Sequence, residues 1–153
     1  MLSKHIGLKR LPEILCVLGA FFMANAIAQT PISSAPVDAR VYFIEPKDGQ
    51  AFSSEEGKGI DIKFGLSGME VSPAGMAAPN SGHHHLLINM DQLPALNLPL
   101  PASDQVRHFG KAQTSTKVSL PPGKHRLQLL LGNHVHIPHS PAVMSEVIEI
   151  EVK

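Results

Sequence analysis

The chain has 153 residues, with 13 Lys and Arg, 13 Asp and Glu, and a formal net charge of zero. This balance argues against nucleic acid binding, which needs a clustered basic face, and against a polybasic patch for anionic membranes. The sequence has no Trp and one Tyr, so aromatic platforms that stack on sugars or bases are scarce.

The first 28 residues have the pattern of a secretory signal peptide. Positive residues come first, an apolar run follows from 14 to 23, and Ala26-Ile27-Ala28 resembles a signal peptidase site. The run is shorter than the roughly 20 apolar residues of a transmembrane helix. We therefore expect cleavage after Ala28, no membrane insertion of the mature chain, and a periplasmic or secreted location. An uncleaved anchor is the alternative.

The mature chain, residues 29–153, contains no cysteine, because Cys16 is the only one and it lies in the apolar run. Disulfides and thiolate metal sites are therefore excluded. A chain of 125 residues is long enough to form one domain with its own core. We expect a signal peptide at 1–28, a flexible Pro/Ser-rich leader at 29–38, and a single domain at 39–153.

Turn signals divide this domain into short stretches with strand patterns. Residues 40–45 are β-rich and precede the turn sequence Pro46-Lys47-Asp48-Gly49. Residues 59–66 alternate between apolar and polar side chains, as in a half-buried strand. Further strands are predicted at 82–90, 114–120, 124–131 and 146–153. After residue 28 no window has a convincing helical period.

Six or seven short strands at these intervals predict an all-β fold, an antiparallel β-sandwich of immunoglobulin-like type. In immunoglobulin order, residues 59–66, 82–90, 124–131 and 146–153 correspond to strands B, C, F and G. Strands C and F are then antiparallel neighbours, and the B–C and F–G loops emerge at the same end of the sandwich.

Two histidine blocks lie at that end, Gly82-His83-His84-His85-Leu86 and His134-Val135-His136-Ile137-Pro138-His139. Each block contains a His-x-His pair, and residues two apart in a strand point to the same face. Imidazole is the commonest protein ligand for transition metals. The predicted metal ligands are His83, His85, His134, His136 and His139.

Copper is the first choice of metal and zinc the second. Neutral imidazoles without thiolates suit Cu(II), Zn(II) and Ni(II), and the methionines at 69, 76 and 144 would favour copper further. A structural zinc site usually uses cysteines. No Asp or Glu lies in either block, so we expect no catalytic acid–base pair and no enzymatic activity. An enzyme would need a carboxylate brought in by the 91–104 loop.

The remaining histidines have structural interpretations. His84 falls on the apolar face of its strand, where a partly buried, hydrogen-bonded histidine is the simpler reading. His125 begins strand F at the opposite end, where a tyrosine often caps such sandwiches, and His108 has no assigned role. The alternative to a metal site is a surface histidine patch on a non-enzymatic interaction module.

Six sequence blocks, taken together, resemble one family of bacterial exported proteins. They are Phe43-Ile44-Glu45-Pro46-Lys47-Asp48-Gly49, Lys63-Phe64-Gly65-Leu66-Ser67-Gly68-Met69, Gly82-His83-His84-His85-Leu86-Leu87-Ile88-Asn89, His108-Phe109-Gly110-Lys111-Ala112-Gln113-Thr114, Leu120-Pro121-Pro122-Gly123-Lys124-His125 and Leu127-Gln128-Leu129. The family is known as domain of unknown function 4399, and the resemblance runs from about Val41 to Val152. It implies an exported compact domain and supplies no activity. Asn89 stands where the resemblance leads us to expect Asp.

These observations predict an exported copper carrier or buffer that uses a histidine cluster. Its partners would be the metal ion and a periplasmic protein.

Overall fold

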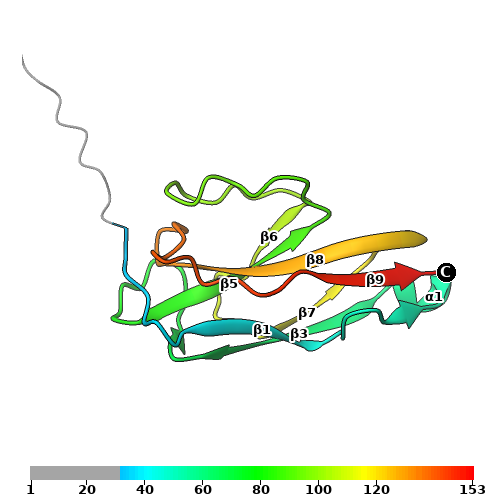
Figure 1. Cartoon of the computed structure of the whole chain (residues 1–153), viewed down its shortest axis with the longest axis horizontal. Helices are drawn as coiled ribbons and strands as arrows, with labels where there is room; N and C mark the ends of the chain where they lie inside the picture. The colour runs from blue at the N-terminus through cyan, green and yellow to red at the C-terminus, as the bar shows by residue number, and fades with distance from the viewer. Residues whose placement is uncertain (1–31) are drawn as a thin grey trace, which may run out of the picture. The chain divides into compact units, whose positions relative to one another are not determined.

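The computed structural model describes residues 32–153, which form two β-sheets packed face to face (Figure 1). The first sheet has the order β1-β3-β7, and β3 is antiparallel to both neighbours. Its strands are β1 (Arg40–Glu45), β3 (Ile60–Ser67) and β7 (Ser115–Val118). The predicted signal peptide at 1–28 lies outside the described residues.

The second sheet has the order β2-β9-β8-β5-β4. Its sixth strand, β6, also pairs with β5. Its strands are β2 (Ala51–Phe52), β4 (Glu70–Val71), β5 (Ser81–Ile88), β6 (Val106–His108), β8 (Gly123–Gly132) and β9 (Ile148–Val152). A four-residue helix, α1 (Ser54–Gly57), follows β2 and begins with a capping box between Ser53 and Glu56.

This arrangement is an immunoglobulin-like β-sandwich, which confirms the predicted fold class. Strands β1, β3 and β7 occupy the places of strands A, B and E, while β5, β8 and β9 occupy those of C, F and G. All six predicted strands are present within two residues of their expected bounds. The short strands β2, β4 and β6 were not predicted, because two or three residues carry too little periodicity to detect.

The two faces of the second sheet are both covered. Its inner face packs against the first sheet through a core that includes Phe64, Leu86, Leu129 and Ile150. Its outer face carries a smaller apolar cluster of Leu87, Leu100, Val106 and Leu130. Because apolar clusters cover both faces of the sheet at β5, all eight residues of this strand are buried. Polar side chains on β5 are therefore removed from water on either face.

Residues 33–35, within the predicted leader, lie along the body of the sandwich. Ser34 forms a parallel bridge with Ser140, the Ser140 N–H donates to the Ser33 carbonyl at 2.9 Å, and the Ala35 N–H donates to the Ser140 carbonyl at 3.3 Å. Among residues 32–153, no helix has the length and apolar character that crossing a membrane requires.

Candidate metal centre

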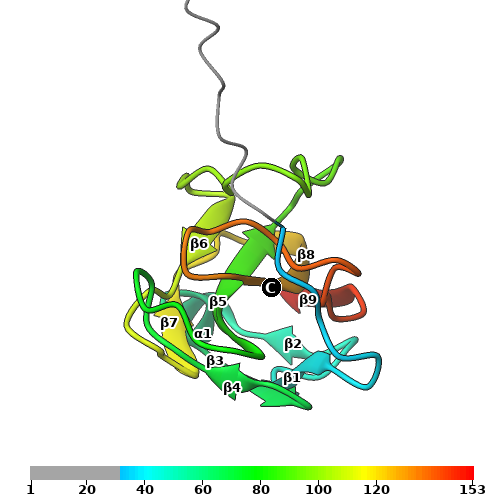
Figure 2. The ribbon, with the colours of Figure 1, turned by 90° about the vertical axis from the view of Figure 1, so that its left-hand side faces the viewer.

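Four imidazoles meet on the outer face of the second sheet, at the end where β5 begins. His83 and His85 come from β5, His108 from β6, and His136 from the loop after β8. One ring nitrogen from each residue lies within 4.8 Å of the corresponding atom of every other. Figure 2 faces this end of the sandwich and shows the segment after β8 crossing in front of β5. We call these residues the four-histidine group.

Strand geometry places three of these side chains. His83 and His85 are two residues apart on β5 and so project to the same face. His85 is directly opposite His108 in the antiparallel pairing of β5 with β6, and the two rings stack with centroids 5.2 Å apart. Cross-strand partners of this kind lie about 5 Å apart at Cβ, which is close enough for both rings to share one ligand.

Two glycines make room for the rings. A Cβ atom on Gly132 would lie 2.7 Å from Cε1 of His85, and a Cβ atom on Gly110 would lie 2.5 Å from Cε1 of His108. Real Cβ atoms do not approach other atoms so closely, so any larger residue would force the rings to move. Gly132 faces His83 in the pairing of β8 with β5. The positions of the imidazoles therefore depend on the absence of side chains here.

The fourth histidine of the group, His136, is held by a loop that Asn133 organises. The Asn133 side-chain oxygen accepts hydrogen bonds from the backbone N–H groups of Val135 and Ile137, both at 3.0 Å. The His136 N–H donates to the Asn133 carbonyl at 2.9 Å. This loop gives His136 a φ of 67°, a left-handed conformation that a non-glycine residue rarely adopts. Such strain persists only where the surroundings impose it, and it concentrates at functional sites.

Burial disfavours the charged form of three histidines of the group. Burial, followed by the neighbouring His108 and His136, lowers the pKa of His83 to about 4. Burial, followed by His83, lowers the pKa of His85 to about 3. Burial also lowers the pKa of His108. Neutral imidazoles have a free lone pair on one ring nitrogen, which is the form that binds a metal ion.

The ring nitrogens have few partners within the protein. His83 Nε2 lies 3.0 Å from His136 Nδ1, and one of the two donates to the other. His83 Nδ1 and both nitrogens of His85 are buried without a hydrogen-bond partner among the described residues. Buried polar groups in proteins are nearly always paired, so unpaired ones need an explanation. A bound ligand would supply it.

The spacing of the group fits a transition metal ion. Two imidazole nitrogens bound to one metal at about 2.0–2.1 Å lie roughly 2.9–4.2 Å apart, depending on the angle between the bonds. The 3.0 Å between His83 Nε2 and His136 Nδ1 is within that range, and the 4.8 Å limit for the whole group exceeds it slightly. A small inward movement of the rings would complete the coordination sphere.

The structure divides the predicted ligands into two sets. His83, His85 and His136 belong to the four-histidine group, which confirms that the two histidine blocks meet. His134 and His139 lie outside this group and line a neighbouring pocket instead. His108, which had no predicted role, is the fourth member. It was missed because its strand has three residues, although the sequence His108-Phe109-Gly110 carries the glycine that accommodates the ring.

The three methionines expected near the site differ in their surroundings. Met69 is buried in the main core and Met144 packs against the outer apolar cluster, so both have structural places. Met76 is 60% exposed, on a loop that hydrogen-bonds to the backbone of Gly110 and His134. The four-histidine group contains no carboxylate. The arrangement can therefore hold a cation through nitrogen atoms alone.

His84 and His125 have no part in the group. His84 is fully buried in the main core with its ring 4.7 Å from that of Phe64, and burial lowers its pKa to about 4. The expected hydrogen bonds are missing within the part of the chain that the structure describes, since neither ring nitrogen of His84 has a partner there in hydrogen-bonding geometry. His125 is structural, as predicted, and its Nε2 lies 2.7 Å from the Pro121 carbonyl.

Comparison with known proteins places this fold and histidine block in a family. The family model for a domain of unknown function, DUF4399, matches residues 62–153, which is more than half of the chain. The chain belongs to the DUF4399 family. The matched range includes the whole four-histidine group and leaves out the 43–49 block. The family description gives no activity, and no curated protein matches the sequence.

Two solved structures resemble this DUF4399 domain. One comes from the fibronectin(III)-like modules of CbhA from Clostridium thermocellum, with 16% identity, 74% of this chain and 94% of that chain covered, and a TM-score of 0.47. The other is the PKD domain of human KIAA0319, with 11% identity, 80% and 86% covered, and a TM-score of 0.40.

Proposed function

We propose that this protein is an exported carrier or buffer for a transition metal ion, with Cu(II) as the preferred ion and Zn(II) as the second. The observation that carries the proposal is the convergence of four imidazoles, two of them buried with ring nitrogens that have no partner among residues 32–153. A site made of imidazole nitrogens alone can bind a divalent cation without carboxylate ligands. The sequence pattern of residues 1–28 is the basis for export.

Copper is proposed because of the chemistry of the donor set. For a given set of nitrogen ligands, affinity rises along the first-row divalent metals to Cu(II) and falls again at Zn(II). The methionine argument for copper now depends on Met76 alone, since Met69 and Met144 are packed in apolar clusters. The order of preference therefore follows from imidazole chemistry and not from thioethers.

A carrier or buffer is proposed in place of a structural site because half of the ligand set is accessible. His83 and His85 are buried, whereas His108 is exposed and His136 is partly exposed. An ion held on one side by accessible ligands can exchange with a partner protein. Catalysis is not proposed, since no carboxylate lies in the group to act as a general base.

Equilibrium titration of the purified, tag-free protein with Cu(II) and with Zn(II) tests this function. The key variant is His108→Ala, because an exposed residue can be replaced with little effect on folding. We expect stoichiometric binding by the wild type and a Kd raised by at least the roughly 10- to 100-fold that loss of a supporting residue costs at metal sites. The double variant His83→Ala/His85→Ala should abolish binding.

His134→Ala is the matched control, because His134 is a partly exposed histidine of the same loop and lies outside the group. Its Kd should equal that of the wild type. Weak binding that neither His108→Ala nor the double variant changes would overturn the metal proposal. The interaction module without a metal would then be the working function.

A further inference from the structure

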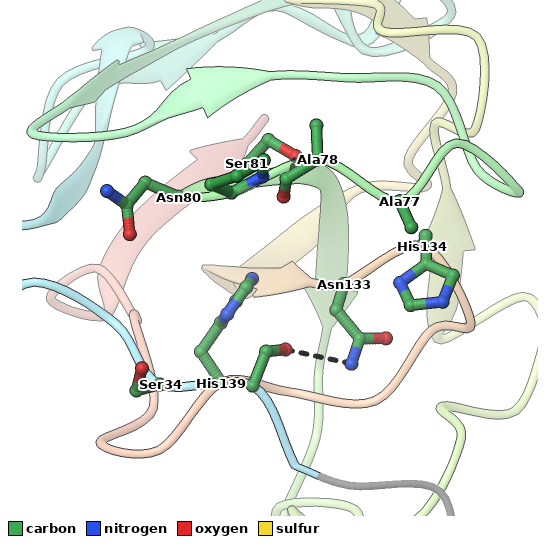
Figure 3. Close-up of a pocket in the computed structure, with 10 residues that line it drawn as sticks. Ser34, Ala77, Ala78, Asn80, Ser81, Asn133, His134 and His139 are labelled. Atoms are coloured by element: carbon green, nitrogen blue, oxygen red, sulfur yellow. Dashed lines mark hydrogen bonds between the residues drawn. The ribbon is translucent and has the colours of Figure 1, made fainter.

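A cavity of about 480 Å³ lies beside the four-histidine group (Figure 3). It is formed between the segment that leads into β5, the loop after β8, and the N-terminal segment along Ser140. Its lining residues include two histidines, three serines and two asparagines, and none of them is Asp, Glu, Lys or Arg. Such a cavity is polar without carrying a fixed charge.

His139 is the unusual residue of this cavity. It is 3% exposed, and neither ring nitrogen has a partner in hydrogen-bonding geometry among the described residues. Figure 3 shows its ring directed from its own loop toward the chain at Asn80 and Ser81. Burial lowers the pKa of His139, and backbone groups of Ser34, Ser33 and Ser81 near the ring partly oppose this shift. His139 therefore places two buried, unpaired ring nitrogens in the wall of the cavity.

Residues that line the cavity are close in sequence to members of the four-histidine group. Nε2 of His139 lies so near Gly82 that a Cβ atom there would be 3.0 Å away, and the next residue is His83. His134, at the other side of the cavity, is two residues from His136. His139 is also among the residues whose charge would affect His83. An ion in the cavity would therefore lie close to the buried His83.

We propose that this cavity is a second metal site, a loading site in which His139 and His134 hold an incoming Cu(II) or Zn(II) ion before it moves to the four-histidine group. This proposal rests on the function proposed above. A volume of about 480 Å³ accommodates an ion with several of its waters, each of which occupies roughly 30 Å³. Two imidazoles bind more weakly than four, so the ion passes on to the deeper group.

Stopped-flow mixing of Cu(II) alone with the full protein, followed through the absorption of the bound ion, tests the loading site. A residue on the path of the ion alters association and dissociation by the same factor, whereas a ligand of the final site alters the Kd. We expect His139→Gln to lower both rate constants by about tenfold, equivalent to about 1.4 kcal/mol on the barrier, with an unchanged Kd. Circular dichroism and the stoichiometry of bound copper verify that the variant is folded.

Ala77→Leu provides a second test that removes no histidine. Ala77 is exposed, and Figure 3 shows its side chain directed toward His134, so a leucine would fill part of the cavity without disturbing the core. It should also slow association and dissociation together. Wild-type rate constants in both variants would overturn the loading site, as would a raised Kd in His139→Gln. Failure of the proposed function is a separate result, in which the wild type itself binds no copper.

Discussion

The two ends of the β5–β8 pair use buried histidines in opposite ways. At one end, His125 Nε2 donates to the Pro121 carbonyl, which can only accept, and His125 Nδ1 therefore accepts from the Asn89 side-chain amide at 3.0 Å. At the other end, His83 and His85 are at least as buried, but three of their ring nitrogens have no hydrogen-bond partner among residues 32–153. The first end uses imidazole to stabilise the fold. The second end keeps lone pairs free, which reduces stability in the absence of a ligand.

Asn89 explains why both ring nitrogens of His125 have hydrogen-bond partners. Its side-chain oxygen accepts from the Arg126 N–H at 2.9 Å while its amide donates to His125. An amide performs both tasks with a neutral histidine, whereas a carboxylate has no hydrogen to donate. The asparagine at a position where the family resemblance leads us to expect Asp is therefore consistent with a structural role, far from the four-histidine group.

The largest expected effect is the loss of stability of the metal-free protein in acid. The pKa of His84 is lowered to about 4 from 6.5, so the unfolded chain takes up a proton at a higher pH than the folded chain. Its contribution to stability is fully present above pH 6.5 and is lost as the pH falls through about 4. One such group contributes roughly 3 kcal/mol, at about 1.36 kcal/mol for each pKa unit. His83 and His85 act in the same direction.

Urea unfolding in the presence of a chelator, repeated between pH 7.5 and pH 4.5, measures this effect. His84→Leu should make the free energy of unfolding less dependent on pH, because it removes the contribution of one of the three buried histidines. In a separate series without the chelator, free Zn(II) at about 100 times its Kd should add about 2.7 kcal/mol at pH 7. A wild-type stability that is flat across this pH range would contradict the burial of neutral histidines.

The second prediction compares matched substitutions at the two ends. His125→Leu leaves the Pro121 carbonyl and the Asn89 amide without a partner, so we expect a loss of about 2 kcal/mol in the free energy of unfolding. His85→Leu replaces a buried ring that has no hydrogen-bond partner in the described chain, so the metal-free protein should be unchanged or more stable by about 1 kcal/mol.

Both free energies come from urea unfolding at pH 7.5 in a chelator, and metal titration follows on the same samples. His85→Leu should lose metal binding, while the folded fraction of His125→Leu should bind like the wild type. Equal destabilisation by the two substitutions would mean that His85 has a structural role like that of His125. The contrast between the two ends would then fail.

The sequence predicted only part of the difference between the structural histidine at one end and the four-histidine group at the other. Alternation and turn residues predicted the strands, and the immunoglobulin order brought the blocks containing His83 and His136 together. The sequence did not separate His134 from His136, because loop geometry depends on the hydrogen bonds of Asn133. It also did not place His108, because a three-residue strand is defined by its pairing with β5 and not by its own pattern.

The third prediction concerns Gly132, which makes room for His85. In Gly132→Ala the new methyl group would lie 2.7 Å from Cε1 of His85, so the ring must move away from its position in the group. We expect the Kd for Cu(II) to rise about tenfold, which corresponds to about 1.4 kcal/mol. Gly59→Ala is the matched control, since nothing lies within 4 Å of a Cβ atom at that position. If both variants bind Cu(II) equally well, the position of the His85 ring does not limit affinity.

The smallest effect is expected for Met76→Leu, which tests whether a thioether takes part. The Met76 side chain is 60% exposed, and its loop is held by the Ala74 N–H to the Gly110 carbonyl and the Gly75 N–H to the His134 carbonyl. Soft thioether sulfur contributes most to Cu(I) and little to divalent ions that already have imidazole ligands. The Kd values for Cu(II) and Zn(II) should therefore change by less than about twofold, or about 0.4 kcal/mol. A parallel titration with Cu(I) sharpens the result, because a selective loss of Cu(I) affinity would add Met76 to the site and favour a protein that also handles reduced copper.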